Sequence, residues 1–543
     1  MRKAHWLNAA VANALAATVL AGAAHAAVCG DVNNDGAVTA ADGGVLENRL
    51  LNPATPICGG TGIACADLNA NGTVDTGDRT ILGQVIAGVE TLYAPCTGPA
   101  APTCPSTWTG DITTNQHWGP APCEVKLDGP VLVTNNAVLT VDPGVVVKGI
   151  KNPSNPAALI VLRGSKLDAN GTAGNPIVFT SDQPPGSRSL GDWGGVTLNG
   201  FAPVNFPGGV GSSEGLPPGL ALYGGNDPAD NVGRVRFARI EYSGIELSTD
   251  NELNVFTMNA LGTGTVIDHV QAHRGNDDCH EWFGGTVRTK YLVATGCRDD
   301  GLDWQIGFRG TVQFAVVHQA AAGVDGSGRH GFEADNNEFG FNNLPRSNPQ
   351  ICNVTAIGAR PQGITIGGSG AQLRRGTAGT IANSIFASWR SSCLNIADND
   401  TIGRGCLNAT TLRTGADVLR VQDSICFNNG TGGTTVMSGG ATSPCTPAEL
   451  GALWTTSTGL NTTTDPSIPW ATAASFPGNP LNTSNYVPGI ALSGPDCKNV
   501  NPTVFDSAPF IGALPSVGSN WLNDASVCGP GQIAGCWLNV ELN

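Results

Sequence analysis

Residues 269–282 read His269-Val-Gln-Ala-His-Arg-Gly-Asn-Asp-Asp-Cys-His-Glu-Trp282, and residues 291–304 repeat the pattern as Tyr291-Leu-Val-Ala-Thr-Gly-Cys-Arg-Asp-Asp-Gly-Leu-Asp-Trp304. The two copies align at an offset of 22 residues, as between Asp277 and Asp299. A third, looser copy spans residues 314–333. Self-similarity at this period indicates coils that stack on one another and bury a core only between neighbours.

The surrounding sequence favours a mainly β fold built from such coils. Short runs of β-branched residues, such as Val138-Leu-Thr-Val141 and Ile177-Val-Phe-Thr180, are separated by Gly, Asn and Asp. Propeller blades need longer repeats with four strands each, and a jelly roll has no self-match of this length. We therefore predict a right-handed parallel β-helix over residues 107–430.

The chain ends carry other signals. Residues 1–26 are typical of a secretory signal peptide, with Arg2 and Lys3 before an Ala-rich stretch that closes with Ala24-His-Ala26. The apolar part is too short for a membrane span. We expect a small module at 27–96, a Pro-rich linker at 97–106, and an irregular region at 431–543 that caps the end of the coil.

Bulk composition limits the classes of partner and compartment. The formal net charge of −15 argues against a nucleic-acid partner, which needs clustered Lys and Arg. All sixteen cysteines follow the predicted cleavage point, and an even count in an exported chain indicates disulfide bonds whose pairing the sequence leaves open. We predict a secreted extracellular protein, with the periplasm or cell surface as alternatives.

Two acidic loops within 27–96 have the spacing of a cation-binding loop. Residues 31–42 and 67–78 each place oxygen side chains at loop positions 1, 3, 5, 9 and 12 and a glycine at position 6. A twelve-residue loop of this kind wraps Ca²⁺, and the glycine permits the sharp turn in its middle. Apolar residues at helical spacing follow each loop, so we expect a short helix after each.

These loops and helices resemble the two repeats of a type I dockerin. The resemblance implies that Ca²⁺ supports folding and that the module docks onto a cohesin-like scaffold protein. It also implies two sets of metal ligands: Asp31, Asn33, Asp35, Thr39 and Asp42 for one ion, and Asp67, Asn69, Asn71, Asp75 and Asp78 for the other. Loop positions 10 and 11, where dockerins commonly carry a hydroxyl pair, are Ala40-Ala41 and Thr76-Gly77, so partner recognition departs from the family pattern.

The long region also resembles a known group. Leu139-Thr-Val-Asp-Pro-Gly, Gly191-Asp-Trp-Gly-Gly, Glu281-Trp-Phe-Gly-Gly and Leu373-Arg-Arg-Gly are similar to segments of secreted bacterial right-handed β-helix repeat proteins of uncharacterised function. The resemblance implies the fold and no activity.

Candidate chemistry lies in the repeated acidic positions. Coils stack about 4.8 Å apart, so Glu281 and Asp303 should form a ladder of carboxylates on the outside of the coil, which Glu333 extends. Such neighbours need a cation, an arginine or a shared proton between them. One step of the ladder suits a retaining glycoside hydrolase; a bound Ca²⁺ with an arginine nearby (Arg288, Arg298 or Arg309) suits a lyase. The candidate catalytic residues are Glu281, Asp303, Asp277, Asp299 and Arg298.

Other interpretations of the same residues stay open. Repeated Asp-Asp turns also satisfy backbone groups without any ligand. Trp282 and Trp304 either stack on sugar rings or fill the core. Five of the eight histidines fall in residues 269–330, but their spacing matches no zinc pattern.

The sequence as a whole favours a secreted, calcium-binding protein whose β-helix binds or cleaves a polysaccharide as a hydrolase or lyase. The alternative is a non-enzymatic surface, matrix or adhesin-like protein. A groove with an arginine converging on the acidic ladder would favour the enzyme, and a ladder covered by loops would favour the alternative.

Overall fold

A computed structural model defines most of the long region and part of the N-terminal module. It describes residues 40–51, 102–248, 251–319, 330–360, 368–397, 417–430, 432–439, 461–472, 483–517 and 520–523, with the isolated residues Val32, Ala66, Leu82, Trp454, Trp537 and Leu538. The predicted signal peptide lies outside the described residues. Across the described part, no helix has the length and apolar character needed to cross a bilayer.

The chain divides into two units, Met1–Pro99 and Ala100–Asn543. The first unit contains helix α1 (Ala40–Leu51), which begins within the last three positions of the first acidic loop and continues into the segment where a helix is expected. Leu46 of this helix is buried, as are Val32, Ala66 and Leu82. These apolar side chains come from both repeats, so the unit has a small core of its own.

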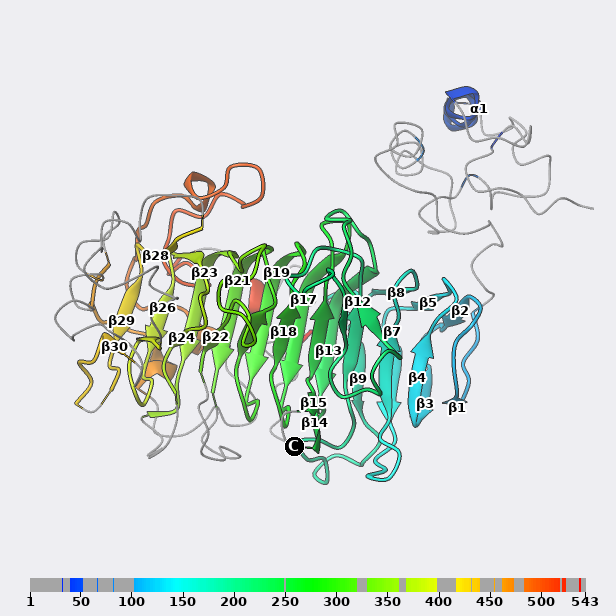
Figure 1. The fold of residues 1–543 in the computed structure, drawn as a ribbon, viewed down its shortest axis with the longest axis horizontal. Coiled ribbons are helices and arrows are strands. Elements are labelled where there is room, and N and C mark those ends of the chain that lie inside the picture. The colour runs from blue at the N-terminus through cyan, green and yellow to red at the C-terminus, as the bar shows by residue number, and fades with distance from the viewer. Residues whose placement is uncertain are drawn as a thin grey trace, which may run out of the picture. The chain divides into compact units, whose positions relative to one another are not determined.

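The second unit is a coil of parallel strands (Figure 1). One strand from each turn joins a ten-stranded sheet, in which neighbours pair in parallel from one turn to the next. Its strands, in spatial order, are β4 (Pro130–Val133), β7 (Ala158–Val161), β10 (Val196–Asn199), β16 (Phe256–Asn259), β18 (His280–Phe283), β20 (Leu302–Gln305), β22 (Phe332–Ala334), β24 (Ala371–Leu373), β27 (Leu394–Ile396) and β30 (Met437–Gly439). Pairing therefore continues past residue 430, where we expected the coil to end.

The remaining strands of each turn join a sixteen-stranded sheet. Its main path is β1 (Thr107–Thr109), β3 (Glu124–Asp128), β6 (Val146–Gly149), β9 (Ile177–Ser181), β13 (Gly233–Glu241), β17 (Val266–His273), β19 (Arg288–Thr295), β21 (Thr311–His318), β23 (Gln350–Ile357), β25 (Gly379–Ala382) and β28 (Leu419–Gln422). Off this path lie β2 (Gln116–Trp118), β5 (Val138–Val141), β8 (Lys166–Asn170), β26 (Ile385–Ala387) and β29 (Ile425–Phe427). The β-helix prediction is confirmed.

Strand β13 joins two sides of the coil into one long strand. Its first half pairs with β8 and its second half with β9, and the bend between them is at Phe237, whose φ is +43°. The next turns bend at the equivalent residues His269, Tyr291 and Phe314, which also have positive φ. Few non-glycine residues adopt this conformation, so the repeated corner is a defined element of the coil.

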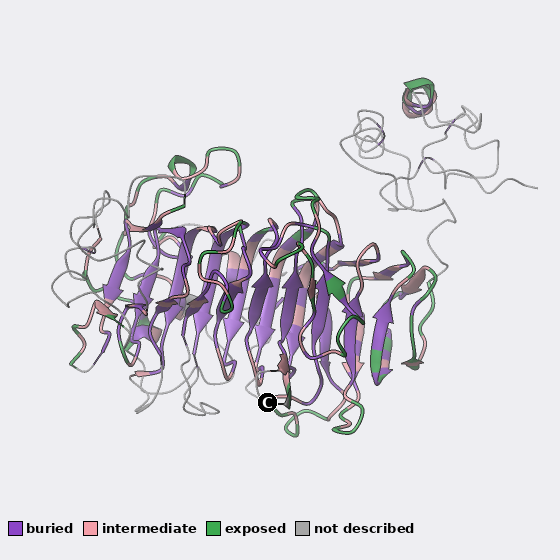
Figure 2. Ribbon diagram, in the orientation of Figure 1, coloured by how far each residue is buried: buried purple, intermediate pink, exposed green. Residues whose placement is uncertain are grey.

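Side chains alternate between the inside and the outside of the coil. One apolar cluster runs inside it from Ile112 to Trp454, and buried residues line the strands along its length (Figure 2). Trp282 and Trp304 belong to this cluster and are at most 1% exposed. Their alternative role, stacking on sugar rings, is therefore wrong.

The aromatic corner residues form a stacked column on the outside of the sixteen-stranded sheet. Ring centroids are 4.3 Å apart between Phe237 and His269, 4.3 Å between His269 and Tyr291, and 5.0 Å between Tyr291 and Phe314. Trp521 and Trp537 pack on the column. An exposed aromatic column is unfavourable in water, and these two tryptophans remove much of it from solvent.

The described part of the C-terminal region lies against both the last turn and the side of the coil. At the last turn, Thr462 pairs in parallel with Ile425 of β29. In addition to the tryptophans, described residues of this region hold the flank of the coil through hydrogen bonds such as Asp506 N to Gln313 Oε1, at 2.9 Å. Its short helices are η5 (Pro469–Ala471), η6 (Thr483–Tyr486), η7 (Cys497–Asn499) and η8 (Trp521–Asn523). These contacts cover the side of the coil and shield the apolar column from water.

Disulfides join neighbouring turns and attach the C-terminal region. Among the described residues they are Cys104–Cys123, Cys279–Cys297, Cys352–Cys497 and Cys393–Cys426. The expectation of disulfide bonds is confirmed.

Candidate functional site

The acidic residues predicted from the repeat lie in register. Glu281 of β18 is the parallel partner of Asp303 on β20, and Asp303 is the partner of Glu333 on β22. The 22-residue alignment of the sequence is therefore confirmed as one step from coil to coil. The ladder lies on the outer face of the ten-stranded sheet, because the alternating residues Trp282 and Trp304 point into the core.

The ladder is on the outer face but is not exposed. Glu281 is 3% exposed and Asp303 is 6% exposed. Residues 200–224, which we name the covering loop, leave the sheet after β10 and return, and Gly224 N donates to Gly200 O at its base, at 2.9 Å. The loop contains strands β11 (Gly211–Ser212) and β12 (Leu222–Tyr223), and the Tyr223 ring packs 6.0 Å from that of Phe283 on the sheet.

A hairpin of β14 (Ile245–Ser248) and β15 (Asn251–Leu253) borders the same face. Asn254, directly after this hairpin, donates from Nδ2 to Glu281. On the other carboxylate oxygen, Glu281 Oε1 accepts a hydrogen bond from Gln305 Nε2, at 3.0 Å. The Glu281 carboxylate is therefore held in one orientation by two amides.

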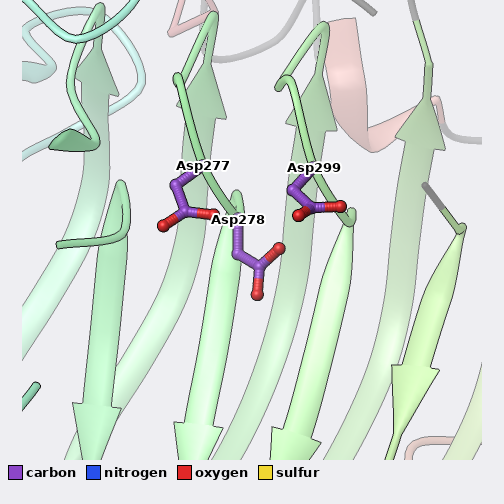
Figure 3. A group of neighbouring side chains, drawn as sticks. All are labelled: Asp277, Asp278 and Asp299. Atoms are coloured by element: carbon purple, nitrogen blue, oxygen red, sulfur yellow. The ribbon is translucent and has the colours of Figure 1, made fainter. Parts of the chain in front are cut away.

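The Asp-Asp pairs lie in the turns that lead into β18 and β20. Asp278 Oδ1 accepts a hydrogen bond from Asp300 N, at 2.8 Å, so the second aspartate of a pair braces the next turn. Asp277 and Asp299 are half-buried, whereas Asp278 is buried. Figure 3 shows these three side chains gathered from neighbouring turns. The same aspartates can therefore both brace the turns and bind a ligand.

Three overlapping groups of carboxylates could hold a metal ion. They are Asp277/Asp278/Asp299, Asp278/Glu281/Asp303 and Asp300/Asp303/Glu333, and within each group one oxygen of every residue lies within 4.8 Å of the others. Ca²⁺ binds oxygen at about 2.3–2.6 Å, so two of its ligands are at most about 5 Å apart. The spacing fits calcium before any movement. We name the first group the outer trio and the second the inner trio.

The electrostatics of the cluster favour either protons or a cation. Burial raises the pKa of Glu281 well above its ordinary value, and the charge of Asp303 raises it further. Burial also raises the pKa of Asp277 and of Asp278, with Asp299 and Asp300 as the respective nearest repelling charges. Without a cation the site therefore retains protons at neutral pH.

Two arginines reach one end of the ladder, and sequence reasoning missed both. Arg374 forms ion pairs with Glu333 and Asp335, and Arg375 pairs with Asp335 at 2.9 Å. Their only sequence signal was the motif Leu373-Arg-Arg-Gly, which we used for the resemblance alone.

The three arginines proposed from sequence have different positions. Arg298 is half-buried beside Asp299 and donates from Nη1 to Asn276 Oδ1, at 2.9 Å. Arg309 forms an ion pair with Asp417. Arg288 lies at the start of β19, whereas Asp299 comes after the end of that strand. The prediction that these two arginines lie near the acidic residues is therefore wrong. Sequence reasoning also missed Arg274, in the preceding turn, whose pKa is lowered by burial.

The histidines do not form a metal site among the described residues, where every candidate group consists of carboxylates. Burial lowers the pKa of His280 to about 4 and the pKa values of His318 and His330 to about 3. These three rings are therefore neutral at physiological pH.

A small pocket lies behind the aspartate turns. Its volume of about 10 Å³ has room for about one water molecule, and it is lined by the disulfide Cys279–Cys297 together with Asp299, Asp300, His318 and His330. The disulfide thus links the residue after Asp278 to the turn that carries Asp299.

In the N-terminal unit, only Asp42 of the predicted calcium ligands is described. It is buried in the first turn of α1, where a carboxylate also interacts favourably with the helix dipole. Asp31, Asn33, Asp35, Thr39, Asp67, Asn69, Asn71, Asp75 and Asp78 lie outside the described residues.

Comparison with known families identifies both parts of the chain. Residues 110–442 match the pectate-lyase-like beta helix domain, which is more than half of the 543 residues. The chain belongs to this family. Residues 29–87 match the dockerin type I domain. Comparison with curated proteins and with solved structures gives no match.

Together the dockerin and the pectate-lyase-like β-helix suggest a carbohydrate-active protein of the cellulosome type. Type I dockerins bind calcium and typically bind cohesins. The dockerin match and the disulfides fit an extracellular or cell-surface protein.

Proposed function

We propose that this pectate-lyase-like β-helix binds an acidic polysaccharide through calcium at the outer trio and cleaves it by elimination. The observation that carries the proposal is the convergence of Asp277, Asp278 and Asp299, two of which are half-buried and reach solvent. A hard cation held there keeps coordination positions for the carboxylate of a sugar acid.

Elimination needs a base beside the cation. It removes the proton next to the sugar carboxylate, forms a C=C bond and breaks the glycosidic C–O bond, whose oxygen takes up a proton. When bound, the cation draws electron density from the sugar carboxylate and makes that proton more acidic. Arg298 is the proposed base because it is half-buried and its Nη1 donates to Asn276 Oδ1, on the residue before Asp277. Arg274 is the second candidate, since burial lowers its pKa.

A hydrolase that uses Glu281 and Asp303 has less support. Both are buried under the covering loop, and a sugar would have to displace that loop to contact them. We propose that these two residues act behind the substrate site and do not touch the substrate.

The same burial favours one alternative, a non-enzymatic protein whose β-helix is a rigid binding surface. In that case the outer trio retains polysaccharide without cleaving it. The dockerin repeats serve either protein by attaching it to a cohesin-like scaffold. We propose that they bind Ca²⁺ through the two ligand sets given above.

An assay on a panel of acidic and neutral polysaccharides separates these functions. We expect unsaturated products from an acidic polysaccharide only, no product in EDTA, and loss of product in Asp277→Asn. Glu124→Gln, which changes an exposed carboxylate on β3, is the control. New reducing ends without unsaturated products indicate a hydrolase, and calcium-dependent retention without cleavage indicates the binding protein. Cleavage that persists in EDTA contradicts the proposal.

A further inference from the structure

The inner trio has features that the proposed function does not use. Asp278, Glu281 and Asp303 are all buried, and one oxygen of each lies within 4.8 Å of the others. In the described part of the chain no lysine or arginine forms an ion pair with any of them, because Arg374 pairs with Glu333 and Asp335 further along the ladder. Three buried carboxylates without a paired base either keep their protons or bind a cation.

Asp303 supplies an independent indication of a ligand. Its Oδ1 is fully buried and has no hydrogen-bond partner among the described residues. The side chain faces Asp278 and Glu281 on one side and Asp300 and Glu333 on the other. Burial of a carboxylate oxygen without a hydrogen-bond partner or a cation destabilises the folded protein. Such atoms therefore normally have a partner.

The covering loop brings a further carboxylate to the same face. Glu214 forms a side-chain hydrogen bond with Glu252 of β15, and its charge raises the pKa of Glu281. Its neighbours fix its position, since Asn259 Nδ2 on the sheet donates to Ser213 Oγ at 2.9 Å and Gly215 N donates to Asn251 Oδ1 at 2.9 Å. A side chain placed in this way adds negative charge to a face that is already acidic.

We propose that a second divalent cation, Ca²⁺ by its all-oxygen surroundings, binds in the inner trio. Its ligands come from β18, β20 and the turn between the sheets, so it joins two coils. Asp278 belongs to both trios and bridges the two ions. The inner ion is enclosed by protein and has a structural role.

Calcium content of the full chain tests the site. Protein stripped with EDTA is dialysed against CaCl₂, and bound calcium per chain is measured by atomic emission. We expect Glu281→Gln and Asp303→Asn each to bind one ion fewer than wild type. The double variant Asp277→Asn/Glu281→Gln should bind two fewer, and Glu124→Gln should match wild type. The dockerin loops are the same in every variant, so their ions cancel.

Two results would overturn the proposal. Unchanged calcium content in Glu281→Gln shows that no ion uses this residue. A double variant that loses only one ion shows that the two trios share a single ion. Glu281→Gln keeps the shape of the side chain and removes a like charge, so a folded protein is expected.

Hydrogen exchange tests the role of the ion in joining the coils. Backbone amides of β18 and β20 should exchange at least about tenfold faster in EDTA than in calcium. Glu281→Gln, which leaves the outer trio intact, should show fast exchange in both. Equal exchange of wild type in calcium and in EDTA contradicts the proposal. Both measurements are made without polysaccharide, so their outcome is independent of whether the outer trio binds or cleaves a substrate.

Discussion

Glu281 and Asp303 are parallel partners on β18 and β20, one rung apart, and both are buried on the outer face of the sheet. Two carboxylates at the spacing of adjacent strands repel each other strongly when water is excluded. The pair therefore exists either with bound protons or with a bound cation. This choice controls how the stability of the β-helix responds to pH and to calcium.

The metal-free protein should lose stability as pH rises. Burial raises the pKa of Glu214 and of Glu333 to about 8, above the range of an unfolded glutamate. A group with a raised pKa in the folded state stabilises below its unfolded pKa, and this stabilisation is lost as pH rises through 8. We expect the melting temperature in EDTA to fall between about pH 5 and about pH 8, which is the range between the unfolded and the folded pKa of these groups.

Two comparisons define that experiment. In calcium the fall should be smaller, because a cation replaces the protons on the carboxylates. The double variant Glu214→Gln/Glu333→Gln, which removes both groups with a raised pKa, should flatten the curve in EDTA. A melting temperature that rises over this pH range would mean that the carboxylates are ionised in the folded protein and have favourable partners without a metal ion.

Removal of one ligand from the outer trio should weaken binding of calcium and polysaccharide together. We expect Asp277→Asn and Asp299→Asn each to lower the calcium affinity of that site by about 10- to 100-fold or more. Titration calorimetry of the stripped chain measures the change. Thr257→Val, on the outer face next to Glu281, is a buried control outside the trio; a similar loss in this variant would argue against specific coordination.

Replacement of Arg374 should destabilise the β-helix. Arg374→Met removes the partner of Glu333 and one of the two arginines paired with Asp335, so the Glu333 carboxylate is left uncompensated, at a cost of about 3 kcal/mol. Denaturant unfolding measures the loss. The control is Lys148→Met, whose partner Glu124 is exposed and whose ion pair should contribute at most about 1 kcal/mol. Equal effects of the two variants would refute the assignment.

The disulfide Cys279–Cys297 should affect both stability and cation binding. Its removal opens a loop of 18 residues, which corresponds to about 3 kcal/mol of unfolding free energy. The variant also loses the covalent link between Cys279, the residue after Asp278, and the turn that carries Asp299. The affinity for calcium should therefore fall. Cys104–Cys123 closes a loop of nearly equal length, 19 residues, elsewhere in the coil.

The paired alanine variants of these two disulfides therefore form a matched set. Both should unfold more easily, but only the loss of Cys279–Cys297 should weaken calcium binding. Equal calcium affinity in the two variants would separate the disulfide from the cation site.

The sequence predicted the coil and the register of its acidic rungs because both follow from a local repeat. Strands of neighbouring turns pair in parallel, so an offset of 22 residues places Asp303 beside Glu281 without further information. The alternation of Trp282 and Glu281 on opposite faces follows from strand geometry in the same way.

The remaining features depend on contacts that no repeat encodes. Arg374 reaches Glu333 across 41 residues, because a long segment lies between β22 and β24 and interrupts the period. The covering loop is rich in Gly and Pro, which indicates turns but not the surface on which they pack. Its return over the ladder is decided by Tyr223 and Phe283, and only the folded chain brings these residues together.

The aromatic column at the corner of the coil has a consequence for biogenesis. Phe237, His269, Tyr291 and Phe314 are synthesised well before Trp521 and Trp537, the residues that pack on the first three of them. A chain that emerges from its N-terminus can stack these coils while their aromatic edge still faces water. Until the last residues arrive, that edge is a surface on which two nascent molecules can associate. The time between synthesis of the coil and synthesis of its tail therefore sets the period in which this protein is most prone to aggregate.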